Sequence, residues 1–437
     1  MLKVVKFGGS SLADADQYKK VKNIIKADPS RKVVVVSAAG KRNSDDHKIT
    51  DLLYLSHAHI KYGVEASSIF DMIESRYIEI KERLGLSVDI AAHLKCIKDD
   101  MEKGASQDFL VSRGEYLSAV LMADYLGYRF VDASEWVTFG YDGEIDTEVS
   151  YEKLRAFSID GGIVTPGFYG LLPNGEVKVM TRGGSDITGA LAAAALNADV
   201  YENWTDVPGV LMADPRIVKD PLPIKSITYD ELRELSYMGA QVLHEATVYP
   251  VKECNIPLNI RDTNNPELPG TMILKECEAT DNSDNFITGI AGKKDFSIIS
   301  ITKSGMSSSI GTFRMIAEIF ENHKVAIEYT PSGIDSISVV VSTKASQKRI
   351  YSILGEIEKK IKPENIEITN NISIIAVVGR KMAFKPGSSG KLFAALGQNG
   401  INIRMISQGP DERNIIVGTD NKDYEKTIQI IYENFIR

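Results

Sequence analysis

Buried-strand and helix patterns alternate along the first part of the chain. Residues 2–7 form an apolar run that stops at Gly8 and Gly9, which is typical of a strand followed by a turn. Residues 14–27 then have the spacing of an amphipathic helix, and residues 32–37 contain four consecutive valines. An unbroken apolar run of that kind favours a strand in a parallel sheet that is covered on both faces.

The alternation continues through the middle of the chain. Residues 50–127 are mostly helical in pattern, and short strands are expected near residues 130–131 and 162–165. A helix rich in small residues is expected at 186–197. Strands that alternate with helices over such a length predict an α/β domain, with a mainly parallel sheet between helical layers.

Near residue 265 the pattern changes to loop-forming Asn, Pro and Gly, and residues 276–285 are polar and acidic. This predicts a linker. Beyond it, a helix followed by a short strand occurs at 315–327 and again, at one constant offset, at 391–403. We interpret the repeat as two tandem βαββαβ units with a small-molecule or subunit interface between them. Two unrelated α+β pieces are the alternative.

The composition of the 437 residues is that of a globular protein, with 43% hydrophobic and 25% charged residues and a net charge of −8. No Lys/Arg block is present, so no nucleic-acid partner is expected. Cys96, Cys254 and Cys277 lack the C-x-x-C spacing of zinc sites. The longest run of small apolar residues, 190–196, is too short to cross a bilayer. No secretion signal opens the chain, so a cytoplasmic protein without a membrane partner is expected.

The segment from Lys6 to Ser11 carries the first candidate chemistry. Gly8 and Gly9 follow a strand and precede a helix, so their N–H groups can point at an anion such as phosphate. Lys6 adds a compact positive charge. A plain Gly-Gly turn is the alternative. Gly-x-Gly, the start of the dinucleotide fingerprint, is absent from the chain, and the segment 387–392 only superficially resembles a P-loop because its glycines are too close together.

Three further motifs combine turns with charge. A second glycine pair follows Arg182 and precedes Asp186. The guanidinium suits a carboxylate or phosphate. For Asp186, a purely structural role as a carboxylate in the first turn of a helix is the alternative. Glu115 follows a glycine in a helical stretch, where a solvated residue is the alternative. The turn-rich segment 204–216 fits the lining of a nucleotide site or a plain connection.

In combination and in order, these motifs resemble the aspartokinase family. The motifs that carry the resemblance are Lys6-Phe7-Gly8-Gly9-Ser10-Ser11, Ile49-Thr50-Asp51-Leu52-Leu53, Ser112-Arg113-Gly114-Glu115, Pro166-Gly167-Phe168, Arg182-Gly183-Gly184-Ser185-Asp186 and Trp204-Thr205-Asp206-Val207-Pro208-Gly209. The tail is similar to the tandem ACT domains of that family. No homoserine dehydrogenase portion follows, so a monofunctional enzyme is expected.

The resemblance implies an amino-acid-kinase fold over residues 1–275, followed by two ferredoxin-like α+β ACT domains at 286–364 and 365–437. It implies ATP-dependent phosphorylation of L-aspartate to 4-phospho-L-aspartate, the first step of lysine, threonine and methionine biosynthesis. Magnesium would be bound through the nucleotide phosphates, with no protein side chain as a metal ligand. The ACT domains would hold an amino-acid effector, lysine or alternatively threonine, and would join a homodimer or homotetramer.

The resemblance also assigns residues by position. Catalysis falls to Lys6 and Asp186. The ATP site would be formed by Lys6, Gly8, Gly9, Ser10, Thr205, Asp206, Leu211, Arg216, Gln241 and Val242. The aspartate site would be formed by Ser37, Thr50, Glu115, Phe168, Arg182 and Ser185. The effector pocket would be formed by Met306, Ser309, Ile327, Glu328, Asp335 and Ser336. For these last residues, a purely structural role in the ACT fold is the alternative.

Three positions depart from the family pattern. Gln241 stands where a lysine is usual, Leu211 stands where an aromatic residue is common, and the loop 41–48 diverges before Thr50. Competing functions are a sibling kinase acting on N-acetylglutamate, glutamate or uridylate, an amino-acid sensor with an inactive kinase domain, and a nicotinamide oxidoreductase. Glu115 with the tandem units argues against the first, an intact set of charged motifs against the second, and the missing Gly-x-Gly against the third.

Overall fold

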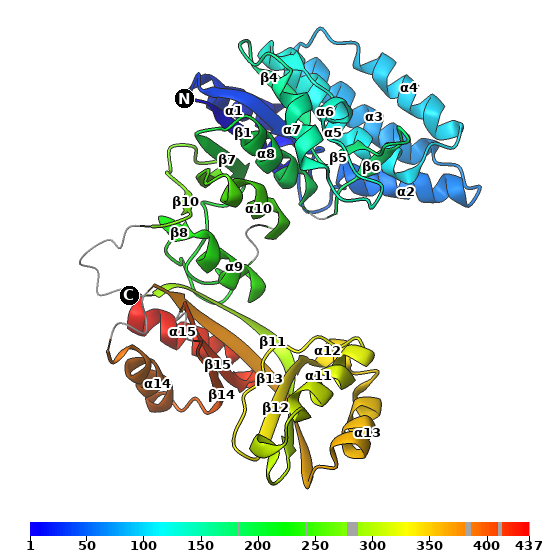
Figure 1. Ribbon diagram of the computed structural model, residues 1–437. Coiled ribbons are helices and arrows are strands. Elements are labelled where there is room, and N and C mark those ends of the chain that lie inside the picture. Colours follow the sequence, from blue (N-terminus) through cyan, green and yellow to red (C-terminus); the bar gives the residue numbers. More distant parts are fainter. Residues whose placement is uncertain are drawn as a thin grey trace. The chain divides into compact units, whose positions relative to one another are not determined.

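The computed structural model describes residues 1–181, 183–240, 243, 245–277, 287–380, 386–409 and 413–436. These residues form two compact units (Figure 1). The first unit contains most of the chain up to Cys277. The second contains the rest, together with Leu211–Leu222 and most of the helix α9 (Tyr229–Tyr237).

The first unit is built on an eight-stranded sheet with the order β3-β4-β2-β1-β7-β9-β10-β8. The strands are β1 (Lys3–Phe7), β2 (Arg31–Val36), β3 (Arg129–Phe130), β4 (Ile163–Pro166), β7 (Val200–Thr205), β8 (Ser226–Thr228), β9 (Leu258–Asp262) and β10 (Thr271–Leu274). All neighbouring pairs are parallel except β9 and β10. The expected mainly parallel sheet is therefore confirmed.

Helices cover both faces of this sheet, as the buried valines of β2 require (Figure 1). One layer consists of α1 (Ala15–Lys26), α2 (Ile49–Lys61), α3 (Ser67–Leu84), α4 (Ile90–Glu102) and α5 (Gln107–Leu126), which pack on Phe7, Val34 and Val36. The other layer is led by α8 (Gly184–Ala195), with α7 (Thr147–Arg155) and α10 (Glu245–Glu253) beside it. Because side chains alternate along a strand, Phe7 faces the first layer and Lys6 faces α8.

Several local predictions are confirmed. The helix expected at 14–27 is α1, which Asp14 caps by accepting hydrogen bonds from the backbone of Asp16 and Gln17. The helical stretch 50–127 is resolved into α2 to α5. The unit also contains a short 3-10 helix, η1 (Gly9–Leu12), the helix α6 (Ala133–Trp136) and a hairpin of β5 (Tyr169–Leu171) and β6 (Val177–Val179).

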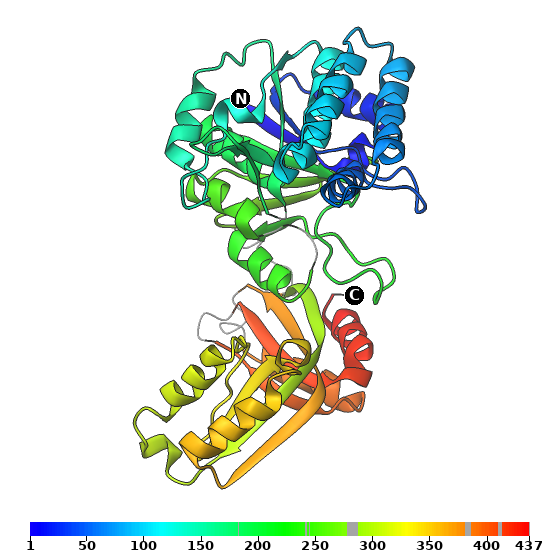
Figure 2. The same ribbon diagram turned by 90° about the vertical axis from the view of Figure 1, so that its right-hand side faces the viewer.

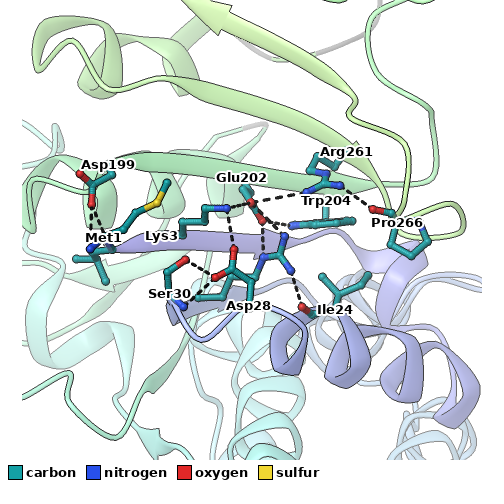
Figure 3. Close-up of polar contacts among 12 residues, drawn as sticks. Met1, Lys3, Ile24, Asp28, Ser30, Asp199, Glu202, Trp204, Arg261 and Pro266 are labelled. Carbon is teal, nitrogen blue, oxygen red and sulfur yellow. Dashed lines mark hydrogen bonds and ion pairs between the residues drawn. The ribbon is translucent and has the colours of Figure 1, made fainter.

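A buried charge cluster ties the central strands together on the α1 side of the sheet (Figure 3). Glu202 of β7 is 1% exposed and accepts hydrogen bonds from Arg31 Nε of β2 at 2.8 Å and from Trp204 Nε1 at 2.9 Å. Lys3 Nζ of β1 lies 3.2 Å from the same carboxylate, and Arg261 of β9 lies 3.9 Å from it. Burial alone would raise the pKa of Glu202, but the hydrogen bond and charge of Arg31 hold that pKa below its usual value.

The second unit has a five-stranded antiparallel sheet with the order β12-β11-β13-β15-β14 (Figure 2). Its strands are β11 (Ile287–Thr302), β12 (Ser336–Ser342), β13 (Asn365–Gly379), β14 (Ile403–Ser407) and β15 (Asn414–Asp420). The helices α11 (Thr312–Asn322) and α13 (Ile350–Ile361) pack on one half of the sheet to form a first lobe. The helices α14 (Ser388–Gln398) and α15 (Tyr424–Phe435) pack on the other half to form a second lobe. The two expected α+β units are therefore present.

The long strands β11 and β13 run through both lobes. The end of β11 pairs with β12 in the first lobe, whereas its beginning pairs with the end of β13 in the second. One expected strand is missing: residues 325–327 form no regular strand, and the residues that follow them pair with β12 through isolated bridges at Tyr329 and Ser332. Pro331, which has no N–H to donate, interrupts the ladder there.

None of the helices in the part of the chain that the structure describes has the length and the apolar character needed to span a membrane.

Candidate functional site

The carboxyl ends of the central parallel strands meet at one edge of the first sheet. The N–H of Gly8, after β1, donates to Trp204 O near the end of β7 at 3.1 Å, and Ser37 N, after β2, donates to Phe7 O at 3.2 Å. The N–H of Gly167, after β4, donates to Val36 O at the end of β2 at 3.0 Å. Ligands of open α/β sheets bind at this edge, and the described members of the predicted phosphate and aspartate sets in the first unit lie along it.

Two glycines allow loops to approach each other closely beside β1. Gly40 N donates to Gly9 O at 2.8 Å. A Cβ on Gly9 would lie 2.9 Å from Ala38 O, and a Cβ on Gly40 would lie 2.6 Å from the carbonyl carbon of Gly9. Any larger residue would separate the loops. The predicted phosphate loop, Gly8 to Ser10, is therefore held against the loop that follows β2.

Lys6 and Asp186 meet at the start of α8. Lys6 is 7% exposed, and its Nζ lies 2.5 Å from Asp186 Oδ1. The ammonium also lies beside the glycine segment, because a Cβ on Gly8 would be 3.5 Å from Lys6 Nζ. Asp186 stands in the first turn of α8, so it favours that helix end and pairs with Lys6 at the same time. The structure thus joins the two residues predicted to be catalytic.

Glu115 is brought to the same edge by α5. A Cβ on Gly114 would lie 2.8 Å from Ala38 Cβ, so only a glycine lets α5 come this close to the loop after β2. The Glu115 carboxylate there accepts a hydrogen bond from the backbone of Ala38. Its Oε2 is buried and has no hydrogen-bond partner within the described residues.

Burial raises the pKa of Glu115 to about 8, although the hydrogen bond from Ala38 and the charge of Arg113 oppose the shift. Arg113 does not compensate this carboxylate directly. Its guanidinium donates to Ser112 Oγ at 2.9 Å and lies over the rings of Phe109 and Tyr116, at 4.5 and 4.8 Å. Glu115 is therefore a buried carboxylate without a direct cationic partner among the described residues, which suits it to bind an incoming cation.

Phe168 follows β4, and Ser185 lies in the first turn of α8. Phe168 has a φ of 81°, a left-handed conformation that non-glycine residues hold mainly where the surroundings impose it. Its N–H donates to Thr188 Oγ1 at 3.0 Å. A Cβ on Gly167 would lie 2.6 Å from Ser185 Cβ. Both predicted aspartate-site residues therefore belong to this edge, whereas Arg182 lies outside the described residues.

Thr50 stands in the first turn of α2, and the adjacent Ile49 N donates to Ala39 O at 3.2 Å. The preceding loop 41–48 is anchored by the pair of Asp46 with Arg76 of α3 at 2.6 Å. Burial opposes ionisation of Asp46, but hydrogen bonds from Arg42 and the charge of Arg76 lower its pKa. This loop is thus fixed to α3 and positions Thr50 next to the strand ends.

The predicted nucleotide residues are distributed over both units. Thr205 ends β7 in the first unit, and its hydroxyl donates to Asp206 Oδ1 at 3.2 Å. Leu211 and Arg216 belong to the second unit, where Arg216 forms a 2.6 Å ion pair with Asp214. Gln241 and Val242 lie outside the described residues.

Four of the predicted effector residues lie together in the first lobe of the second unit. Asp335 Oδ1 accepts a hydrogen bond from Gly305 N at 2.8 Å, and its backbone carbonyl accepts one from Lys303 N at 2.9 Å. These bonds hold the loop with Met306 and Ser309 against Asp335 and Ser336, at the start of β12.

The other two effector candidates lie elsewhere in that lobe. Ile327 packs against its hydrophobic core. Glu328 N donates to Val340 O at 2.9 Å, toward the other end of β12, and the Glu328 carboxylate accepts a 2.5 Å hydrogen bond from Tyr237 of α9. The predicted effector residues therefore lie in two places. Glu328 is hydrogen-bonded to α9, whereas Asp335 lies beside the loop that contains Met306.

Sequence reasoning missed Asn203, whose Nδ2 donates to Asp186 Oδ1 at 3.0 Å. It also missed Ala38, which supplies the backbone bond to Glu115. A signal for Asn203 exists, since Glu202 and Asn203 are adjacent polar residues inside a strand that is buried on both faces. No comparable signal marks Ala38, because its role depends on its backbone.

The described residues at this edge offer few side-chain oxygen atoms that could coordinate a magnesium ion brought in by the nucleotide. No group of three or more His, Cys, Asp or Glu residues within the described ranges could hold a metal ion by itself. Asp186 Oδ1 already engages Lys6 and Asn203, so the described residues offer no preassembled set of protein ligands. These residues fit a metal ion that arrives with phosphate ligands of its own.

Comparison with known proteins identifies the relatives of this chain. A model of the amino acid kinase family matches residues 1–262, and a model of the ACT domain matches residues 375–435. Aspartokinase 3 of Bacillus subtilis is 35% identical over 99% of this chain and 98% of its own length. The crystal structure of Clostridium acetobutylicum aspartate kinase is 48% identical, covers 99% of this chain and 100% of its own, and superposes with a TM-score of 0.93.

Aspartokinase III of Escherichia coli provides two liganded structures that each cover 100% of both chains at a TM-score of 0.75. One is a complex with aspartate and ADP, described as the R-state, at 25% identity. The other is a complex with lysine and aspartate, described as the T-state, at 26% identity. With an identity of 35% to a curated relative over nearly the whole of both chains, and with both expected domain types matched, this chain belongs to the aspartokinase family.

Proposed function

We propose that this enzyme transfers the γ-phosphoryl group of ATP to the β-carboxylate of L-aspartate, forming 4-phospho-L-aspartate. The observation that carries the proposal is Glu115, a buried carboxylate with a free Oε2 and a pKa raised to about 8. An uncompensated buried carboxylate is costly, and the ammonium of an amino-acid substrate would compensate it. Such a substrate has a free amino group, unlike N-acetylglutamate or uridylate.

The acceptor needs no general base. An aspartate carboxylate has an ordinary pKa of about 3.9 and is ionised at neutral pH. The chain therefore has to align two anions and reduce the repulsion between them. Lys6 supplies a fixed positive charge, and the N–H groups of the Gly8 to Ser10 loop supply donors. Bound magnesium would neutralise part of the charge on the phosphates.

The remaining roles follow the family positions. Arg182 is proposed to clamp the α-carboxylate of aspartate, while Glu115 pairs with its ammonium. Together these contacts would direct the β-carboxylate toward the loop at Lys6. Ser37, Thr50, Phe168 and Ser185 would complete the aspartate site. Thr205, Asp206, Leu211, Arg216, Gln241 and Val242 are proposed to line the nucleotide.

An ATP-dependent hydroxamate assay tests this proposal, because hydroxylamine traps an acyl phosphate whichever carboxylate forms it. Aspartate, glutamate and N-acetylglutamate would be compared at equal concentrations. We expect hydroxamate with aspartate only, at a rate that depends on ATP and magnesium. A preference for another acceptor would refute aspartate as the substrate. Binding of ATP and aspartate without turnover would instead favour a sensor.

We further propose that an end-product amino acid regulates the enzyme through the ACT domains, with lysine as the first candidate and threonine as the second. The E. coli relative in complex with lysine supports this choice. Met306, Ser309, Asp335 and Ser336 would form the pocket, with Asp335 meeting the side-chain ammonium. Titration of each amino acid, alone and together, tests the proposal, and unchanged activity throughout would refute it. Light scattering would test assembly as a homodimer or homotetramer.

A further inference from the structure

A polar side chain stands in the middle of the buried strand β7. Asn203 is 2% exposed, and it pairs in parallel register with Lys6 of β1, so both side chains face α8. Its Nδ2 donates to Asp186 Oδ1 at 3.0 Å, and Lys6 Nζ lies 2.5 Å from that same oxygen. One carboxylate oxygen is therefore shared by a charged and a neutral donor from neighbouring strands.

We propose that Asn203 is a positioning residue for phosphoryl transfer, which holds the Asp186 carboxylate at the angle that directs the Lys6 ammonium toward the glycine loop. The inference rests on the proposed roles of Lys6 and Asp186. An ammonium has three N–H donors, and a carboxylate held by a second donor engages only one side of it. The other two N–H groups would then be left to donate to anionic oxygens of the nucleotide.

A second contact from the same strand supports this role. Tyr201, two residues before Asn203 and on the same face of β7, donates its hydroxyl to the backbone carbonyl of Asp186 at 3.0 Å. A Cβ on Gly189 would lie 2.4 Å from that hydroxyl, so a glycine is needed for α8 to pack so closely here. The strand β7 thus holds Asp186 by its backbone and by its side chain.

Fold stability does not explain an asparagine at this position. Asn203 Oδ1 is buried and makes no hydrogen bond to any described residue, and an unpaired buried acceptor costs stability. An apolar side chain of similar size, such as leucine, would avoid that cost in the middle of a buried strand. What leucine cannot provide is the N–H donor to Asp186.

Among the described residues, two ionisable side chains contact Asp186 along with Asn203: Lys6 of β1 and Tyr201 of β7. Glu202 follows next to Tyr201 but points to the opposite face of the sheet, where it binds Arg31. A carboxyl group introduced in place of the Asn203 amide would therefore interact mainly with Asp186 and Lys6.

The deciding experiment measures kcat and both KM values for Asn203→Asp and Asn203→Leu across a pH series. At pH 8, Asn203→Asp places a second carboxylate against Asp186, and we expect kcat to fall about tenfold or more with both KM values nearly unchanged. Repulsion between the introduced carboxylate and Asp186 raises the pKa of this pair of carboxyl groups. As the pH falls, the introduced carboxyl takes up a proton and donates a hydrogen bond as the amide did. The ratio of variant to wild-type kcat therefore rises toward acid pH.

Asn203→Leu lacks both donor and charge, so we expect a similar loss that does not depend on pH. Asn259→Leu is the matched control, because Asn259 of β9 is also buried and also has an unpaired Oδ1, but it pairs in register with Glu202. We expect its kcat to equal that of the wild type.

Lys6→Ala in the same series separates the proposed role of Lys6 in phosphoryl transfer from the positioning role of Asn203. If Lys6→Ala turns over normally, the proposed function of Lys6 fails. If Lys6→Ala is inactive while Asn203→Leu keeps wild-type kcat, or if the Asn203→Asp ratio is constant with pH, the positioning role of Asn203 is wrong. Should Asn203→Asp lower the Tm below the assay temperature, the kcat and KM values of Asn203→Leu decide the question.

Discussion

The ammonium of Lys6 lies 2.5 Å from the carboxylate of Asp186, although the two residues are in different elements and far apart in the sequence. Lys6 comes from β1 and Asp186 from the first turn of α8. The pair closes one side of the edge at which the glycine loop, the end of β7 and the Glu115 carboxylate also lie. The residues proposed to neutralise charge and the residue proposed to bind the substrate ammonium therefore lie along one row of strand ends.

Glu115→Gln should weaken aspartate binding. The substitution keeps the shape of the side chain but removes the charge that is proposed to bind the substrate ammonium. A hydrogen bond to a charged group contributes about 1.5–3 kcal/mol, so the KM for aspartate should rise roughly tenfold to a hundredfold. The KM for ATP should stay within about twofold, because it does not use this contact. An unchanged aspartate KM would show that Glu115 does not bind the ammonium.

The pKa of Glu115, raised by burial to about 8, predicts a pH dependence of aspartate binding. Below this value the free enzyme carries a protonated, neutral Glu115, so the KM for aspartate should fall as the pH rises from about 6.5 to 8.5. Glu115→Gln should show no such change. A flat wild-type profile over this range would contradict the raised pKa.

The raised pKa of Glu115 also affects folding stability, which should decrease over the pH range in which aspartate binding improves. The folded state holds the Glu115 proton up to a higher pH than the unfolded state, so the contribution of this group to stability is greatest below its ordinary pKa and is lost as the pH rises toward about 8. Bound aspartate should restore it. Thermal unfolding with and without aspartate at pH 6.5 and 8.5 would measure the effect.

Glu202→Gln should destabilise the first unit. The substitution leaves Lys3, Arg31 and Arg261 without their shared buried carboxylate, and removal of one partner of a buried ion pair costs about 3–5 kcal/mol. Because the pKa of Glu202 is depressed in the fold, its contribution is present above the ordinary Glu pKa and is lost as acid pH protonates the folded state. Urea unfolding at pH 7 would measure the difference.

Glu425→Gln is the control for this loss. Glu425 pairs with Lys294 at 2.6 Å, but both side chains are largely exposed. A surface pair of this kind contributes less than about 1 kcal/mol. Equal effects of the two substitutions would show that the Glu202 cluster does not hold the strands together.

Asp335→Asn and Glu328→Gln should differ in their response to the effector. Asp335 lies with Met306 and Ser309, whereas Glu328 accepts a hydrogen bond from Tyr237. If Asp335 binds the side-chain ammonium of lysine, Asp335→Asn should raise the lysine concentration for half-inhibition about tenfold or more. Glu328→Gln should leave lysine affinity, measured by calorimetry, within about twofold. The reverse order of effects would place the pocket at Glu328.

The first strand and its loop were predictable because their signals are local. The apolar run at 2–7 followed by Gly8 and Gly9 specifies a strand and a turn without reference to the rest of the chain. The proposed catalytic pair could be assigned only through family resemblance, since no periodicity indicates that Asp186 reaches Lys6. Asn203 required the parallel register of β1 with β7, which depends on how the whole sheet is ordered.

The second unit shows the same limit in another form. Its helices and the constant offset between its two halves were visible in the sequence, and two α+β lobes are present. The sharing of β11 and β13 between the lobes was not visible, because an apolar strand pattern does not say where its partners change. Nor did the helical pattern of α9 indicate that this helix folds with the second unit, since that depends on tertiary contacts such as Tyr237 with Glu328.

The central claim, that phosphoryl transfer to aspartate depends on the positive charge of Lys6, is tested most directly by the kcat of Lys6→Ala in the hydroxamate assay with saturating ATP and aspartate. Loss of one preorganised contact to the transition state costs about 3–4 kcal/mol. We therefore predict a kcat at least a hundredfold below that of the wild type, with an unchanged circular dichroism spectrum. A correctly folded Lys6→Ala enzyme that forms aspartyl hydroxamate at a rate near that of the wild type would contradict the account.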